Sequence, residues 1–242
     1  MDFEKIDQVF NDYVDTFDWD NDYVRLKYFH TIEVANISYE VASRLNLSDE
    51  EKDLAKLIGY LHDVGRFIQI TKGNTYKDKV MDHATEGVKV LFEEGLIREF
   101  ITEDKYDEII KKAVNNHNKY KIEDEVNDKE LLFANIIRDS DKIDIFRVCT
   151  EEYQYKMEAI PSAKVLECFD NETSVRLQDI KNKSDSTLCV LAFIFDFNYK
   201  ESIELLQEKG YYIDFINSIE VSQENSDTFN KIKKKVLKKL EV

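Results

Sequence analysis

The chain contains very few residues that interrupt a helix. Proline occurs once in 242 residues, at Pro161, and glycine occurs six times. Leu, Ile, Lys and Glu, which are compatible with helical backbone, are abundant. Apolar residues make up 43% of the chain, which is enough to build a core. We therefore expect an all-α protein.

Apolar residues recur at helical spacing along most of the chain. The segments that show this pattern are 2–17, 25–45, 48–63, 83–94, 105–116, 129–152, 186–208 and 226–240. Ser48 is followed three residues later by Glu51, a pair that is typical of a helix start. We expect residues 1–155 to form one helical core and residues 156–242 to add helices that pack on it.

The formal net charge of the chain is −16. A field of that sign repels polyanions, so a nucleic-acid polymer is not an expected partner, whereas metal ions in a cleft would still attract a small phosphorylated substrate. No apolar run approaches the length of a membrane span, and the N-terminus lacks a signal-peptide pattern. We expect a cytoplasmic protein without a membrane partner, in which Cys149, Cys168 and Cys189 are reduced thiols.

Every histidine of the chain lies in its first half. The four are His30, His62, His83 and His117, and each stands in or beside a helical pattern. A single histidine on a helix is more often packed in a core than bound to a metal. Four of them near carboxylates, however, form a ligand set that suits Zn, Mn or Fe. This set predicts a metal-dependent enzyme.

His62 is followed directly by Asp63, at the end of a predicted helix. Adjacent residues of a regular helix point about 100° apart, so both can face one ion only where the helix is ending. Gly65 would give the backbone the freedom to turn there. We expect His30 from an upstream helix and Asp141 from a downstream helix to complete a four-ligand site.

These residues resemble the HD-domain superfamily of metal-dependent phosphohydrolases over about residues 25–150. The segments that carry the resemblance are 62–67 (HDVGRF), 82–87 (DHATEG) and 140–142 (SDK). The resemblance implies an HD-domain-like helical bundle with additional C-terminal helices. It also implies hydrolysis of a phosphomonoester or phosphodiester, in a nucleotide-like or other small substrate.

The resemblance further implies how divalent transition metals are bound. One ion would take His30, His62, Asp63 and Asp141, and a second would take His83 and His117, with Asp63 bridging the two. The nucleophile would be a metal-bound hydroxide that bridges the ions. Mn, Fe, Ni, Co, Zn and Mg all suit such ligands, so the identity of the metal stays open.

Several residues near the ligands have open roles. In a one-metal site, His83 and His117 would instead bind phosphate or donate a proton. Candidate phosphate contacts are Arg66, which ranks first, Lys142 and Arg147. Asp144 competes with Asp141 as a ligand. Glu33 and Glu86 each follow a histidine by three residues and would orient the imidazoles.

Two branches of the superfamily are not supported by the sequence. The Gly-Tyr-Pro element of the cyclic-dinucleotide branch is missing, and the segment 66–69 (RFIQ) lacks the two acids of the stringent-response hydrolases. A di-iron oxygenase with the same six ligands remains an alternative, which oxidation-dependent absorption would reveal. A non-catalytic nucleotide-binding module is a further alternative.

Overall fold

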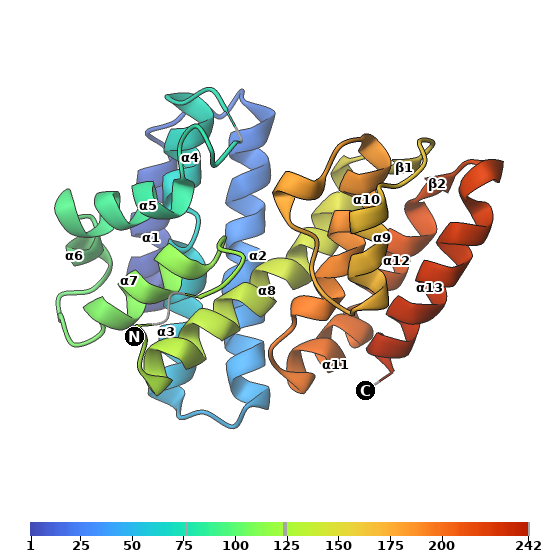
Figure 1. Ribbon diagram of the computed structural model, residues 1–242. Helices are drawn as coiled ribbons and strands as arrows, with labels where there is room; N and C mark the ends of the chain where they lie inside the picture. Colours follow the sequence, from blue (N-terminus) through green and yellow to red (C-terminus); the bar gives the residue numbers. More distant parts are fainter. Residues whose placement is uncertain (76, 123–124, 242) are drawn as a thin grey trace. The chain divides into compact units, whose positions relative to one another are not determined.

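Helices dominate the computed structural model, which describes residues 1–75, 77–122 and 125–241 (Figure 1). The predicted all-α fold is confirmed. The chain divides into two compact units, Met1–Asp141 and Lys142–Val242. This division falls inside helix α8 (Asp128–Glu152), which contributes residues to both units, whereas the sequence prediction placed the limit at residue 155.

The first unit consists of helices and the segments that connect them. They are α1 (Phe3–Val14), α2 (Asp22–Arg44), α3 (Asp49–Leu61), α4 (Val64–Thr71), α5 (His83–Val88), the π-helical turn η1 (Lys89–Glu93), α6 (Ile97–Phe100), α7 (Asp107–Asn116) and the first part of α8. Each helix predicted in this region is present, with ends that differ by a few residues. The pattern did not predict α4 and α6, which are too short to show a clear helical period.

The start of α3 follows the predicted capping pattern. The Ser48 side chain accepts a hydrogen bond from the Glu51 backbone N–H, and the Glu51 carboxylate accepts one from the Ser48 N–H at 3.1 Å. These two bonds satisfy donors that the first turn of a helix otherwise leaves open. The cap fixes where α3 begins.

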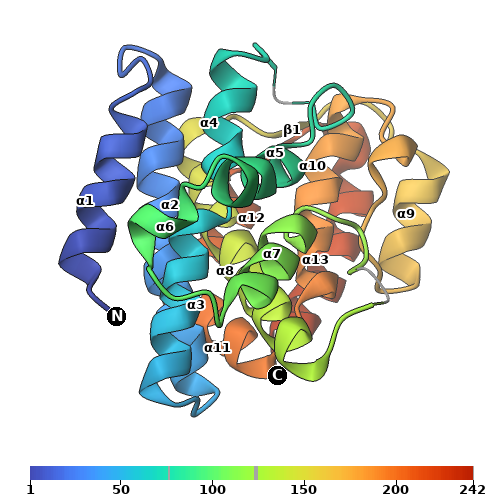
Figure 2. The ribbon, with the colours of Figure 1, turned by 90° about the vertical axis from the view of Figure 1, so that its left-hand side faces the viewer.

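Aromatic side chains pack α1 against α2, α3 and α4. The ring of Phe10 lies 5.7 Å from that of Tyr28 on α2, 5.5 Å from that of Tyr60 on α3 and 6.1 Å from that of Phe67 on α4. Such ring pairs add to the free energy gained by burying the apolar surface. Figure 2 shows α1 alongside α2, as these contacts require.

Two glycines allow neighbouring helices to touch through their backbones. A Cβ atom at Gly59 in α3 would lie 2.4 Å from the Cα of Ala35 in α2, and one at Gly65 in α4 would lie 2.1 Å from the carbonyl oxygen of His83. Gly65 is inside α4 and its φ is not positive. The expectation that Gly65 frees the chain to turn was therefore wrong; it gives α5 room to approach α4.

The second unit is also helical, apart from one short pair of parallel strands. Its elements after α8 are β1 (Lys156–Met157), α9 (Ala163–Asp170), η2 (Leu177–Asp179), α10 (Lys183–Leu191), η3 (Ala192–Asp196), α11 (Lys200–Lys209), α12 (Tyr211–Ser218), β2 (Glu220–Val221), η4 (Gln223–Asn225) and α13 (Ser226–Leu240). Rings of Phe146, Tyr212 and Phe215 meet in its core.

The sequence predicted α13 but was wrong about a single helix over 186–208. That region contains α10, the 3₁₀ turn η3 and α11, with extended backbone at Phe197 and Tyr199. Neither proline nor glycine stands at the break, so the apolar spacing continues across it without a signal.

The three cysteines are free thiols in the structure. Among the helices that the structure describes, none combines the length and the apolar character that a membrane crossing requires.

Replacing Gly65 with alanine should destabilise the first unit by about 1–3 kcal/mol, because the added methyl group meets backbone atoms of α5 that cannot rotate away. Urea unfolding would measure the effect. Gly87→Ala is the matched control, since a Cβ atom there comes no closer than 3.3 Å, to a methyl group of Val114. Equal loss of stability in the two variants would contradict the proposed role of Gly65.

Candidate metal centre

The six side chains that the sequence predicted as ligands converge within the first unit. Their ligand atoms form two groups, each with all atoms within 4.8 Å of one another: His30, His62 and Asp141 in the first group, and Asp63, His83 and His117 in the second. The four imidazoles and the Asp63 carboxylate are buried. Helices far apart in the sequence supply them, so the cluster exists only in the folded chain.

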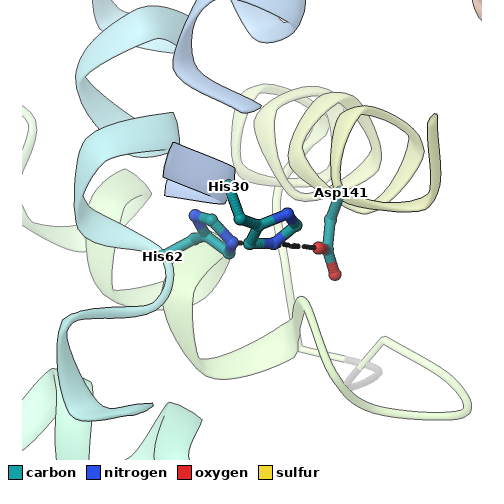
Figure 3. Close-up of side chains that lie close together, drawn as sticks. All are labelled: His30, His62 and Asp141. Carbon is teal, nitrogen blue, oxygen red and sulfur yellow. Dashed lines mark ion pairs between the residues drawn. The ribbon is translucent and has the colours of Figure 1, made fainter. Parts of the chain in front are cut away.

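The first group joins α2, the end of α3 and α8 (Figure 3). Nε2 of His30 lies 3.0 Å from Oδ1 of Asp141, and Nε2 of His62 lies 3.8 Å from the same oxygen. Figure 3 shows both rings and the carboxylate directed toward one another.

The carboxylate of Asp63 stands between the two groups. Its Oδ2 lies 3.8 Å from Nε2 of His30 and 3.6 Å from Nε2 of His62. Its Oδ1 lies 3.3 Å from Nε2 of His83 and 3.6 Å from Nε2 of His117. Each oxygen therefore faces a different pair of imidazoles.

The joint between α3 and α4 explains how neighbouring residues reach the same cluster. His62 is the C-cap of α3 and keeps helical backbone, whereas Asp63, at φ −110° and ψ 14°, leaves it. Asp63 occupies the N-cap of α4 but makes no side-chain capping bond. Its carboxylate is consequently available to the cluster, and the prediction that the pair lies at a helix end is confirmed.

Hydrogen bonds fix the tautomers of two histidines. Nδ1 of His62 lies 2.7 Å from the carbonyl oxygen of Gly59, and Nδ1 of His117 lies 2.7 Å from that of Val114. A carbonyl oxygen only accepts, so each Nδ1 must carry the hydrogen. The lone pair of each ring is then on Nε2, the atom that faces the cluster.

The cluster contains polar atoms that the protein itself does not satisfy. Nε2 of His62 and Oδ1 of Asp63 are buried and have no hydrogen-bond partner in the described part of the chain. Nε2 of His83 and Nε2 of His117 lie only 2.9 Å apart. Buried acceptors without donors cost about 1–3 kcal/mol each. A cation among them would remove this cost, so this set of imidazole and carboxylate ligands fits a divalent metal.

The charge states also suit metal binding. Burial lowers the pKa of His62 to about 3 and lowers the pKa of His83, so both imidazoles are neutral near pH 7. Burial alone would raise the pKa of Asp63, but the charge of Lys27 holds it well below its usual value. Neutral imidazole and ionised carboxylate are the forms that ligate metals.

Comparison with protein families agrees with this geometry. The family model of the HD domain matches residues 28–145 of the sequence, a segment that contains all six side chains. Residues 28–145 form an HD domain. Neither the curated proteins nor the solved structures gave a match to the chain. HD domains constitute a superfamily of metal-dependent hydrolases, and in this one the His and Asp groups are positioned to bind metal.

Two cations lie beside Asp63 in the HD domain. Nζ of Lys27 is 2.7 Å from Oδ2 of Asp63, and Nε of Arg66 is 3.7 Å from Oδ1. The guanidinium of Arg66 also lies 2.9 Å from Nε2 of His83. Arg66 was predicted at this place, whereas Lys27 was missed, although it precedes His30 by three residues and so shares its helix face.

Other candidates from the sequence lie in the second unit. Nζ of Lys142 is 2.8 Å from Oδ2 of Asp196, and a contact of Lys142 with phosphate stays a prediction. Arg147 donates to both oxygens of Asp144, at 2.6 and 3.0 Å. The carboxylate proposed as a competing ligand is thus bound by a neighbouring arginine.

Asp78, which the sequence prediction overlooked, contacts the second ligand group. Its Oδ1 lies 2.6 Å from Nδ1 of His83. The residue expected to orient that ring, Glu86, lies 3.9 Å from Nζ of Lys89. Asp78 stands in a polar segment with several other charged residues, so its spacing from His83 carried no sequence signal.

The metal-free HD domain should contain His62 and His117 as Nδ1–H tautomers at pH 7, because both rings donate from Nδ1 to backbone carbonyls. Two-dimensional ¹⁵N NMR of histidine-labelled protein would report this directly, with the urea-unfolded chain as the control. Protonation of either ring at Nε2 would contradict the description of the cluster.

Proposed function

We propose that this protein is a metal-dependent phosphohydrolase that acts on a phosphomonoester or phosphodiester, in a nucleotide or another small phosphoester. The observation that carries the proposal is the position of Asp63, whose two oxygens face two separate pairs of imidazoles. A carboxylate in that position suits two metal ions better than one.

In this proposal the two ligand groups each hold one divalent ion. His30, His62 and Asp141 would bind the first, His83 and His117 would bind the second, and Asp63 would bridge them. Two such ions would lower the pKa of a bound water and neutralise charge on a phosphoryl group. Asp63, held ionised by Lys27, would keep the ion sites apart at a fixed separation.

Lys27 and Arg66 would bind and orient the phosphate. Both reach the Asp63 carboxylate, so an anion at the metals would lie within their range. Because the protein as a whole, with a net charge of −16, repels anions, positive charge at the site would be needed to attract a phosphate group. The guanidinium of Arg66 can donate two parallel hydrogen bonds to phosphate oxygens.

These cations favour an anionic substrate such as a phosphoester. The six ligands alone would serve either hydrolysis or oxygenase chemistry, because imidazole and carboxylate also bind iron. Oxidation of an uncharged substrate would not require two cations beside the bridging carboxylate. Lys27 and Arg66 therefore support an anionic substrate.

Metal analysis of the purified, metal-replete protein should give about two divalent ions per chain. Asp63→Asn should reduce both the metal content and phosphohydrolase turnover, because it weakens the ligand shared by the two groups. Turnover would be measured anaerobically with Mn²⁺ or Co²⁺ on a panel of nucleotides and p-nitrophenyl phosphate.

Asp104→Asn provides the matched control, since Asp104 is an exposed acid of the first unit outside the cluster. Its metal content and turnover should equal those of the unchanged protein. Full turnover in the Asp63→Asn variant, or activity that requires dioxygen, would overturn the proposed hydrolase.

Lys27→Gln should raise the inhibition constant of inorganic phosphate about tenfold, because it removes a charge-assisted hydrogen bond at the anion site. Metal content would be measured in the same sample, to separate loss of phosphate binding from loss of metal. Lys111→Gln is the control, since Lys111 pairs with Glu108 on the surface of α7. Equal inhibition constants in all three proteins would exclude Lys27 from the phosphate site.

A further inference from the structure

Asp78 belongs to a closed network of polar contacts beside the second ligand group. Its Oδ1 is 2.6 Å from Nδ1 of His83, accepts from Nε2 of Gln69 at 2.9 Å and lies 3.4 Å from a guanidinium nitrogen of Arg66. Arg66 donates to Oε1 of Gln69 at 2.5 Å and lies 2.9 Å from Nε2 of His83. Four side chains therefore hold one another in place.

Gln69 connects this network of side chains to the backbone of the segment before α5. Its side chain is buried, and its Nε2 also donates to the carbonyl oxygen of Met81 at 2.5 Å. Since Gln69 belongs to α4, the network connects the helix after Asp63 to the residues that precede His83. Contacts with Gln69 of α4 and with His83 of α5 thus hold Asp78 in place.

His83 differs from the other histidines in how its ring can be held. His62 and His117 end their helices, and each donates to the carbonyl three residues before it, within its own helix. His83 begins α5, so the residue three before it lies outside any helix. His83 therefore has no helical carbonyl three residues earlier to accept from its Nδ1, and the Asp78 carboxylate accepts instead.

We propose that Asp78 is a positioning residue for metal binding: it holds the Nδ1–H tautomer and the ring orientation of His83, so that Nε2 is presented to the ion of the second group. This inference rests on the proposed function. A carboxylate only accepts hydrogen bonds, so its contact with Nδ1 places the lone pair on Nε2. Partners of this kind typically change metal affinity by about ten- to a hundredfold.

The effect of Asp78 should be confined to one of the two ions. The first ligand group is built from α2, the end of α3 and α8, whereas Asp78 contacts α4 and the first residue of α5. Loss of Asp78 should weaken the Asp63–His83–His117 group and leave the His30–His62–Asp141 group able to bind.

Calorimetric titration of metal-free protein with Mn²⁺ would test this selectivity. Asp78→Leu keeps the approximate size of the side chain but accepts no hydrogen bond, and it should weaken one of two binding events about ten- to a hundredfold. Asp78→Asn keeps an acceptor oxygen and should give an intermediate affinity. Asp104→Asn, the exposed acid-to-amide control, should bind as the unchanged protein does.

The tautomer of His83 gives a second measurement that needs neither metal nor substrate. In ¹⁵N spectra of metal-free protein, His83 should change from Nδ1–H to a mixture of tautomers in Asp78→Leu. The signals of His62 and His117 should stay as they are, which a general loss of structure would not allow. Thermal unfolding would verify that the variant is folded.

Unchanged Mn²⁺ affinities together with an unchanged His83 tautomer in Asp78→Leu would overturn the inference, as would equal weakening of both binding events. The proposed two-metal function fails separately, if the unchanged protein binds fewer than two ions. In that case the His83 spectra still decide the role of Asp78.

Discussion

A single buried carboxylate, that of Asp63, determines how the first unit must be arranged. A buried charge is costly unless other groups balance it, and here Lys27 supplies the balance from α2 while four imidazoles surround the remaining faces. These groups come from α2, α3, α5 and α7. The cluster therefore forms only when these helices are packed together.

The cluster has a cost in the metal-free protein. Acceptors such as Nε2 of His62 and Oδ1 of Asp63 are buried without donors among the described residues. A ligand that binds only the folded state stabilises it according to its concentration and affinity, and metal ions would act here in that way. Stability and activity would then depend on the same ions, so a loss of metal would affect both.

The sequence was sufficient for the helical class and for the six clustered side chains, because few helix breakers and a distinctive set of histidines are both visible in one dimension. It was insufficient where a residue acts through space. Asp78 and Lys27 are ordinary charges until the fold brings them to His83 and Asp63. Gly65 was noticed but misinterpreted, since its role depends on a helix that the pattern had not predicted. The break before α11 has no sequence marker at all.

The contact at Gly65 has a consequence for how the two ligand groups are spaced. It brings peptide atoms of α4, two residues after Asp63, against peptide atoms of α5, which include the carbonyl oxygen of His83. Side chains absorb small displacements by changing rotamer, whereas packed backbone atoms have no such freedom. The distance between the Asp63 carboxylate and His83 thus depends on this direct contact between the backbones of α4 and α5. A side chain at position 65 would therefore change this distance directly, because its Cβ atom would meet backbone atoms of α5.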